Sequence, residues 1–202
     1  MSEPRAPVRG IHVDIPGSAN LALTDLLIDF TGTLALDGLL LPGIAEALIE
    51  LASTLRITIA TADTFRRASE ALQGLPLELR LVDCGEQKAR IVEELGAEHV
   101  VAVGNGRNDM AMFEAAALRI AVLGPEGAAA TLLAVADVVV SDIHIAFDLL
   151  LHPRRLKATL RCQGDEGTEV SRRGEEPEIA HPAVHTRSGR WSSGGHIACR
   201  GT

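Results

Sequence analysis

A short apolar segment that ends in a carboxylate and a tight turn constrains the fold of this chain more than any other feature. Leu26-Leu27-Ile28 leads into Asp29, and Phe30-Thr31-Gly32-Thr33 follows at once. Such a run predicts a buried parallel strand, whose carboxyl end lines the crevice where open α/β sheets bind ligands. Asp29 is therefore a candidate nucleophile, and the backbone N–H groups of residues 30 to 33 are candidate donors to a phosphate. Taken alone, an Asp at a strand end more often forms a turn or caps a helix.

The rest of the chain alternates strand and helix patterns at short spacing. Strands are predicted at residues 10–15, 21–29, 56–60, 77–82, 99–103, 120–123 and 137–140. Helices are predicted from Pro42 to about Leu51, at 64–73, 86–95, 110–117, about 126–135, and about 143–160 with a break or bend at Pro153. This alternation predicts an α/β fold, a three-layer sandwich around a mainly parallel, Rossmann-like sheet.

The 202 residues are enough for one well-packed domain and too few for two large ones. We expect a short lead-in at residues 1–9, one domain at 10–161 and a polar tail at 162–202. The tail is rich in Gly, Ser, Arg, Glu and His and has almost no aliphatic periodicity. Because such a segment cannot bury enough apolar surface to offset its ordering entropy, the sequence predicts that the tail is disordered.

Composition argues against several classes of protein. The net charge of −8 and the aromatic content of 2% disfavour a nucleic-acid binder, which needs positive charge or stacking surfaces. No run approaches about 18 uninterrupted apolar residues, so we expect no membrane span, and no apolar core of a secretory signal is visible. The three cysteines are widely spaced and odd in number, which favours free thiols. These features predict a cytoplasmic protein.

Four segments are expected to meet at one edge of the predicted sheet. They are the strand ends at Asp29 and Thr61, the helix that contains Lys88, and the loop 104–109. Transfer of a phosphoryl group to a carboxylate needs a nucleophile, a cation beside the phosphate oxygens, hydroxyl or amide donors, and a divalent metal held by acids. These segments contain every one of those groups.

The same segments resemble the motifs of the haloacid dehalogenase (HAD) superfamily, and within it the phosphorylation domain of P-type ATPases. The motifs are Asp29-Phe30-Thr31-Gly32-Thr33, Thr61-Ala62-Asp63, Lys88, and Gly104-Asn105-Gly106-Arg107-Asn108-Asp109. The resemblance covers roughly residues 22–160, and four motifs in this order are more specific than any one alone. The resemblance extends to small soluble relatives of these ATPases that lack membrane helices.

The resemblance implies a Mg²⁺-dependent enzyme in which Asp29 attacks phosphorus and becomes an aspartyl phosphate. It implies catalytic roles for Asp29, Thr61 and Lys88. It implies phosphate contacts from Phe30, Thr31, Gly32, Thr33, Thr61, Ala62, Lys88 and Asn108. It implies metal contacts from Asp29, the Thr31 carbonyl, Asn105 and Asp109, with Asn108 and Asp109 also ordering Lys88.

Two positions depart from the family pattern. Many HAD phosphatases have a second Asp two residues after the nucleophile as general acid and base, whereas this chain has Thr31, as the pumps do. Loss of a general base costs about 10²- to 10⁴-fold in rate, so slow hydrolysis of the aspartyl phosphate is expected. The fourth motif has Asn105 where a metal-binding Asp is usual, and an amide oxygen brings no charge to Mg²⁺.

The intervals between the motifs exclude other family architectures. Predicted strands and helices fill the stretch from Asp29 to Lys88, which leaves no room for a nucleotide-binding domain or a cap over the site. We therefore expect no ion pump and an open, capless active site. An open site favours a macromolecular phosphorylated substrate, or a neighbouring subunit of a homo-oligomer acting as a lid, and the sequence leaves both open.

Other interpretations remain for each motif and for the whole chain. Lys88 alone is typical of a solvated helix surface, and Thr61 and Asp63 are typical of helix caps. Gly104-Asn105-Gly106 has the start of a dinucleotide loop but lacks its third Gly. The leading hypothesis is a HAD-type phosphohydrolase with slow turnover. The alternatives are a non-catalytic or regulatory module with the same fold, and a soluble ATP hydrolase similar to the pumps.

Overall fold

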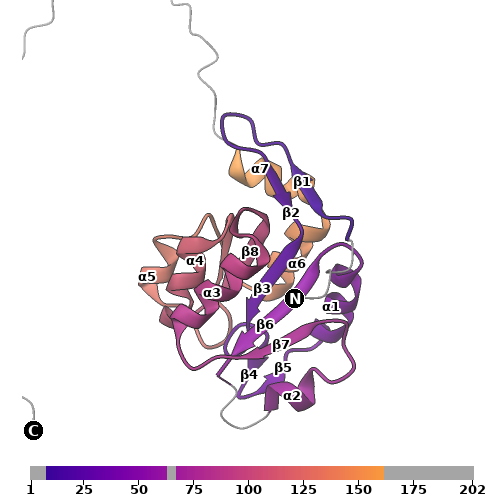
Figure 1. Cartoon of the computed structure of the whole chain (residues 1–202), viewed down its shortest axis with the longest axis vertical. Helices are drawn as coiled ribbons and strands as arrows, with labels where there is room; N and C mark the ends of the chain where they lie inside the picture. Colours follow the sequence, from indigo (N-terminus) through magenta and orange to yellow (C-terminus); the bar gives the residue numbers. More distant parts are fainter. Residues whose placement is uncertain (1–7, 63–66, 162–202) are drawn as a thin grey trace, which may run out of the picture. The chain divides into compact units, whose positions relative to one another are not determined.

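A six-stranded parallel sheet forms the centre of the described part of the chain (Figure 1). The structure is a computed structural model, and it describes residues 8–62 and 67–161. The sheet strands are β3 (Asp25–Asp29), β6 (Arg56–Thr61), β7 (Glu78–Leu81), β8 (Val100–Gly104), β9 (Leu118–Val122) and β10 (Val138–Val140). Two small antiparallel hairpins accompany it, β1 (Ile11–Val13) with β2 (Leu21–Leu23) and β4 (Ala35–Leu36) with β5 (Leu39–Leu40).

The order of the strands identifies where a ligand site is expected. Their spatial order is β10-β9-β8-β3-β6-β7, so the chain winds outward from β3 in one direction and then returns to β8 on its other side. Residue Ile28 of β3 lies opposite Val103 of β8, and Asp29 lies opposite Ala60 of β6. Doubly wound sheets bind ligands beyond the carboxyl ends of the strands at which the winding direction reverses. In this sheet that place lies between β3 and β8.

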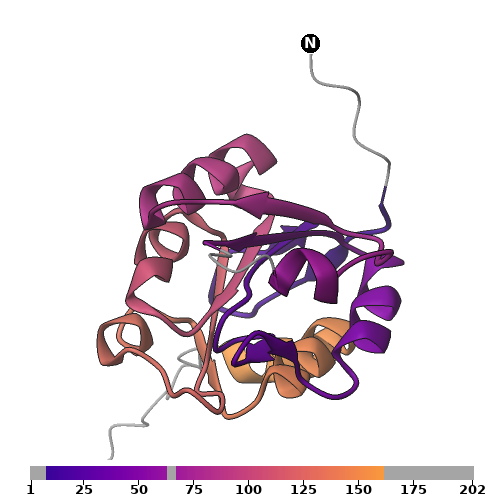
Figure 2. The same cartoon turned by 90° about the horizontal axis from the view of Figure 1, so that it is seen from below.

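Helices cover both faces of the sheet. The α-helices are α1 (Ile44–Ala52), α2 (Arg67–Ala71), α3 (Gly85–Leu95), α4 (Met110–Ala115), α5 (Ala130–Leu133), α6 (Ile143–Leu151) and α7 (Pro153–Leu160). Two 3-10 turns add η1 (Ala97–His99) and η2 (Arg107–Asp109). In Figure 2, α3 and α4 lie on one side of the strands and the orange α6 lies on the other.

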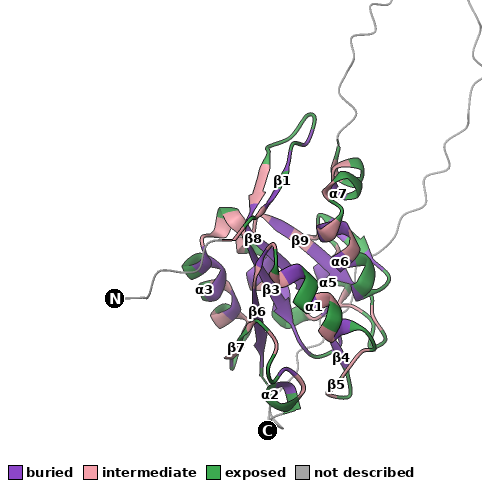
Figure 3. Cartoon of the chain, turned by 90° about the vertical axis from the view of Figure 1, so that its right-hand side faces the viewer, coloured by how far each residue is buried: buried purple, intermediate pink, exposed green. Residues whose placement is uncertain are grey.

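The side-chain alternation of β3 explains these two layers. Leu26 and Ile28 belong to one hydrophobic cluster, with residues of α1 and α6, and Leu27 belongs to the other, with residues of α3 and α4. Successive strand residues point to opposite faces, so a strand that is apolar at every position is buried on both. Figure 3 shows the central strands in the colour of buried residues.

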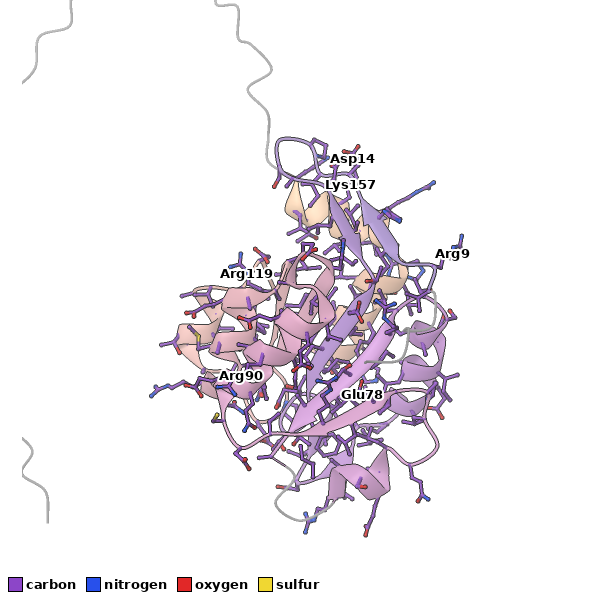
Figure 4. The ribbon with its side chains drawn as sticks, in the orientation of Figure 1. Arg9, Asp14, Glu78, Arg90, Arg119 and Lys157 are labelled. Atoms are coloured by element: carbon purple, nitrogen blue, oxygen red, sulfur yellow. The ribbon has the colours of Figure 1, made fainter. Side chains whose placement is uncertain are left out.

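The β1–β2 hairpin packs beside the last helix of the described chain. Ile11 and Val13 are buried in the same cluster as Leu156 of α7. Lys157 of α7 also pairs with Asp14 at 3.5 Å, and Figure 4 shows the two side chains near each other. Both partners are exposed, so this pair contributes little to stability.

The α/β fold class and the parallel sheet predicted from the sequence are confirmed. No cap domain is evident within residues 8–62 and 67–161. The chain breaks at Pro153 as predicted, because α6 ends at Leu151 and α7 begins at the proline. The helix predicted at about 126–135 is shorter, since a glycine turn occupies residues 124–127 and α5 is only Ala130–Leu133.

Some predictions concern residues that the structure does not describe. The start of the helix expected at 64–73 and the tail at 162–202 lie outside the described ranges. Within those ranges, no helix has both the length and the apolar character needed to span a bilayer.

Candidate active site

The predicted nucleophile lies at the switch point of the sheet. Asp29 is the last residue of β3, and the loop after β8 passes beside it and runs into η2. Asp29 is only 4% exposed. The strand therefore ends in a buried carboxylate at the edge of the sheet where the sequence predicts it.

Lys88 connects the nucleophile to the fourth motif. Its Nζ donates to Asp29 Oδ1 at 2.5 Å and to Asp109 Oδ1 at 2.7 Å. The lysine is 1% exposed and Asp109 is 0% exposed, so the three charges share a site that is shielded from water. One ammonium group thus faces two buried carboxylates.

Asp109 also holds the loop that contains it. Its second oxygen, Oδ2, accepts hydrogen bonds from the backbone N–H of Asn105 at 3.0 Å and of Gly106 at 2.9 Å. A Cβ atom at Gly104 would lie 2.4 Å from that same oxygen, so only glycine allows this approach. Asp109 stands at the N-terminal end of α4, but its side chain makes no capping hydrogen bond with that helix and turns back to the loop.

Thr33 joins the first and fourth motifs on the other side of the nucleophile. Its fully buried hydroxyl lies 3.4 Å from Asp29 Oδ2 and 3.2 Å from Asn105 Oδ1. The Asn105 amide nitrogen donates to the carbonyl oxygen of Gly127 at 2.9 Å, which directs the amide oxygen toward Thr33. A carboxylate oxygen and an amide oxygen therefore lie around one hydroxyl group.

The environment of Asp29 makes its carboxyl group a weaker acid than usual. Burial has the largest effect and the charge of Asp109 adds to it, so both raise the pKa. The charge and hydrogen bond of Lys88 and the N–H of Phe30 oppose them. The net result raises the pKa of Asp29 from 3.8 to about 7.

Lys88 keeps its charge in spite of its burial. Desolvation alone would lower its pKa, but the attraction of Asp29 and Asp109 and the hydrogen bonds to both outweigh it, and the pKa is raised. The lysine lies on the stripe of α3 that also buries Ile91, Val92 and Leu95. That apolar spacing is visible in the sequence and indicates that Lys88 lies on the buried face of the helix, although the sequence-based interpretation did not use it.

A close approach of two elements brings Lys88 to the site. A Cβ atom at Gly85, the first residue of α3, would lie 2.6 Å from the carbonyl oxygen of Asn108. The glycine therefore lets the start of α3 pack directly on η2. This contact aims the lysine, one turn further along, at Asp109.

The predicted phosphate-binding loop offers fewer backbone donors than expected. The N–H of Gly32 donates to Ala35 O at 2.9 Å, and that of Thr33 makes a long contact to Phe30 O at 3.4 Å. The N–H of Phe30 is directed to the Asp29 carboxyl. The turn thus uses much of its hydrogen-bonding capacity to stabilise itself and the nucleophile.

The remaining predicted residues lie around this centre. Thr61 is buried at the end of β6, one residue beyond the position opposite Asp29, and Ala62 is exposed after it. Thr31 and Asn108 are exposed on their loops. Asp63 lies outside the described residues.

Sequence reasoning did not single out two groups that the fold brings to the site. Thr33 was expected to contribute its backbone N–H, whereas its hydroxyl is the group that contacts Asp29 and Asn105. The Gly127 carbonyl comes from a segment predicted to be helical. Neither contact has a local sequence signal, because each joins residues far apart in the chain.

A sequence relative is known for part of the chain. The chain is 46% identical over 78 residues to the uncharacterized protein MJ0073 of Methanocaldococcus jannaschii, and the match covers 37% of this chain and 84% of that protein. The two proteins belong to one family. No protein-family model matches the sequence.

Solved structures with the same arrangement identify the fold. A putative HAD family hydrolase from Streptomyces avermitilis matches with a TM-score of 0.50 and 21% identity, over 59% of this chain and 76% of that one. The cobalt-bound deoxy-D-mannose-octulosonate 8-phosphate phosphatase of Haemophilus influenzae matches with a TM-score of 0.56 and 14% identity, over 67% and 91%. The protein has the HAD superfamily fold.

The HAD fold here also resembles part of an ion pump. A zinc-transporting PIB-type ATPase matches with a TM-score of 0.50 and 29% identity, over 59% of this chain. The match covers 20% of the pump, so this chain corresponds to a small part of it. The predicted likeness to both HAD hydrolases and a P-type ATPase is confirmed.

Proposed function

We propose that this HAD-fold protein is a phosphohydrolase in which Asp29 forms an aspartyl phosphate that is hydrolysed slowly. The observation that supports it most is the buried Asp29–Lys88–Asp109 group at the switch point of the sheet. In the first step a carboxylate oxygen of Asp29 bonds to phosphorus, the bond to the ester oxygen breaks, and that oxygen takes a proton from water. In the second step water attacks phosphorus, and phosphate leaves Asp29.

Lys88 and Asp109 have complementary roles in this proposal. The ammonium group of Lys88 offsets the charge of the nucleophile and of the incoming phosphoryl oxygens. Asp109 uses Oδ1 on Lys88 and Oδ2 on two loop N–H groups, so it is better suited to hold these groups in place than to bind a metal ion directly. Thr61, at the neighbouring strand end, is the proposed hydroxyl donor to the phosphoryl group.

The donor atoms around Asp29 fit a hard divalent cation such as Mg²⁺. Asp29 Oδ2 and Asn105 Oδ1 both lie near the Thr33 hydroxyl, and oxygen ligands are what Mg²⁺ prefers. The buried group has one more negative than positive charge, and burial and repulsion from Asp109 raise the pKa of Asp29 to about 7. A bound cation would supply charge that offsets this excess and the charge of the phosphate.

Thr31 supports the slow second step. It occupies the position two residues after the nucleophile, and its exposed hydroxyl cannot take a proton from water near neutral pH. Without a general base the loss in rate is about 10²- to 10⁴-fold. The aspartyl phosphate should therefore persist long enough to be isolated.

The test is intact-mass spectrometry after incubation with Mg²⁺ and acetyl phosphate. Wild type is expected to gain one phosphoryl group, and Asp29→Asn is expected to gain none and to lose any phosphate release by about 10³-fold or more. Asp25→Asn is the matched control, because Asp25 is a buried carboxylate of the same strand. Equal labelling of wild type and Asp29→Asn would overturn the proposal.

A second candidate is a regulatory module that binds a partner or an anion without turnover. It is favoured by the low exposure of Asp29, 4%, and by the neutral Asn105. It predicts no phosphoryl gain and no phosphate release from any donor in the experiment above. Partner binding that survives Asp29→Ala would support it, and binding lost on that change would count against it.

ATP hydrolysis is a third candidate because of the 29% identity with the pump. A dedicated ATPase should hydrolyse ATP faster than a simple phosphoester. Equal rates with ATP and p-nitrophenyl phosphate would remove this candidate.

A further inference from the structure

A tight glycine turn follows β9 and presents a glutamate next to the site. Gly124-Pro125-Glu126-Gly127 closes with a hydrogen bond from Gly127 N to Gly124 O at 3.3 Å. Gly124 and Gly127 have φ values of 49° and 77°, in the left-handed region that favours glycine. Glu126 is exposed at the tip of this turn.

Two hydrogen bonds and one close approach link the turn and the residues just after it to the first and fourth motifs. The Asn105 amide donates to Gly127 O at 2.9 Å, and the N–H of Ala129 donates to Asn105 O at 2.8 Å. A Cβ atom at Gly124 would lie 2.7 Å from the Gly32 carbonyl oxygen. The position of Glu126 is therefore coupled to that of Asn105 and of the nucleophile loop.

The Glu126 carboxylate lies on the Asn105 side of Gly32. A Cβ atom at Gly32 would be 2.4 Å from Asn105 Nδ2 and 2.9 Å from Glu126 Oε2, so the amide and the carboxylate flank the same point. On its other side Asn105 reaches the Thr33 hydroxyl, which contacts Asp29. Asn105 thus lies between Glu126 and the nucleophile.

We infer that Glu126 supplies the negative charge that the neutral Asn105 does not bring to a divalent cation at Asp29. The inference rests on the proposed function and adds a residue to the cation site. Among the described residues no three Asp, Glu, His or Cys side chains converge as a metal site. Because Asn105 lies between Glu126 and Asp29, Glu126 acts on the ion through its electric field and not as a direct ligand. Such outer partners commonly change metal affinity about 10- to 100-fold.

The test measures Mn²⁺ binding to the full chain by the electron paramagnetic resonance signal of the free ion, which does not depend on activity. Glu126→Gln is expected to weaken binding about 10-fold, and Glu126→Asp, which keeps the charge, is expected to restore most of it. Because the effect is electrostatic, the difference between wild type and Glu126→Gln should shrink in roughly 1 M salt. Glu114→Gln is the matched control, an exposed glutamate on α4.

The outcomes separate this inference from the function on which it rests. If wild type binds Mn²⁺ and Glu126→Gln binds it equally well, the role of Glu126 is wrong and the cation site stands. If Glu126→Asp loses as much affinity as Glu126→Gln, the side chain acts by shape rather than by charge, which also overturns the inference. If wild type shows no Mn²⁺ binding, the cation site itself fails.

Discussion

Strand β3 has a buried aspartate at each end, and the two differ in the charges around them. Asp25 at the amino end is 1% exposed, and Arg56 donates to both of its oxygens, at 2.8 and 2.5 Å. The Thr24 hydroxyl donates to it as well, at 2.7 Å. At this end one carboxylate faces one guanidinium group, which is 28% exposed to solvent.

At the carboxyl end Asp29 shares one ammonium group with a second carboxylate. Lys88 is 1% exposed, so water cannot compensate for the missing positive charge. The pKa of Asp29 is raised to about 7 by this burial and by Asp109. The comparison shows that a buried carboxylate with its own positive partner forms an ion pair, whereas one buried with an unbalanced charge is left needing a cation or a proton.

Replacing the positively charged side chain at each end of β3 should give the largest difference in stability between the two ends. Lys88→Met leaves two buried carboxylates without a positive partner, so a loss of about 3–5 kcal/mol in the free energy of unfolding is expected. Arg56→Met should cost roughly half as much, because water reaches that pair and Thr24 still donates to Asp25. Urea unfolding at pH 8 measures both.

A second substitution makes this test specific. Asp29→Asn in the Lys88→Met background should recover part of the lost stability, since it removes one of the two buried negative charges that lack a positive partner. Equal losses in Lys88→Met and Arg56→Met, with no recovery, would contradict the role given to charge balance.

The stability of the metal-free protein should depend on pH through Asp29, at the carboxyl end of β3. The folded pKa of Asp29 is about 7 and its ordinary value is 3.8, so between these values the folded state holds a proton that the unfolded state has lost. The contribution of the Asp29 proton to the free energy of unfolding is fully present below about pH 4 and is lost as the pH rises through 7. Its size is a few kcal/mol. Urea unfolding in EDTA from pH 4 to 8 measures it.

The Asp29→Asn variant tests the source of that pH dependence. It should remove this part of the decline and be more stable than wild type at pH 8 without metal. Asp25→Asn should keep the decline. Parallel curves for wild type and Asp29→Asn would show that another group is responsible.

The smallest expected difference concerns two threonines, one at each end. Thr33→Val and Thr24→Val each remove a hydroxyl that contacts a buried aspartate. Each should lower the free energy of unfolding, measured in urea, by about 1 kcal/mol. Only Thr33→Val should also slow phosphoryl gain from acetyl phosphate, by several-fold, because Thr33 orients Asp29 and Asn105. Equal slowing by both variants would contradict the specific role of Thr33 at the carboxyl end of β3.

The predictable part of this structure is the part with a local pattern. The apolar runs of β3 and β8 and the helical stripes around them specified the α/β fold and put Asp29 at a strand end. The helix predicted to begin at about residue 126 begins only at Ala130, because the alanines from 128 onward favour a helix while the left-handed Gly124 and Gly127 hold a turn before it. The Thr33 and Gly127 contacts with Asn105 could not be predicted, since they depend on how loops distant in sequence meet.

The order of strands and helices and the residues at the strand ends follow from the amino-acid sequence, because burial on a sheet or a helix face leaves a local pattern in the chain. The burial of Lys88 between Asp29, 59 residues away, and Asp109, 21 residues away, depends on how the elements pack together. A lysine on an apolar stripe keeps its charge in a core only when opposite charges and hydrogen bonds offset its desolvation. Those carboxylates come from other elements, so the charge balance of the site is a property of the fold.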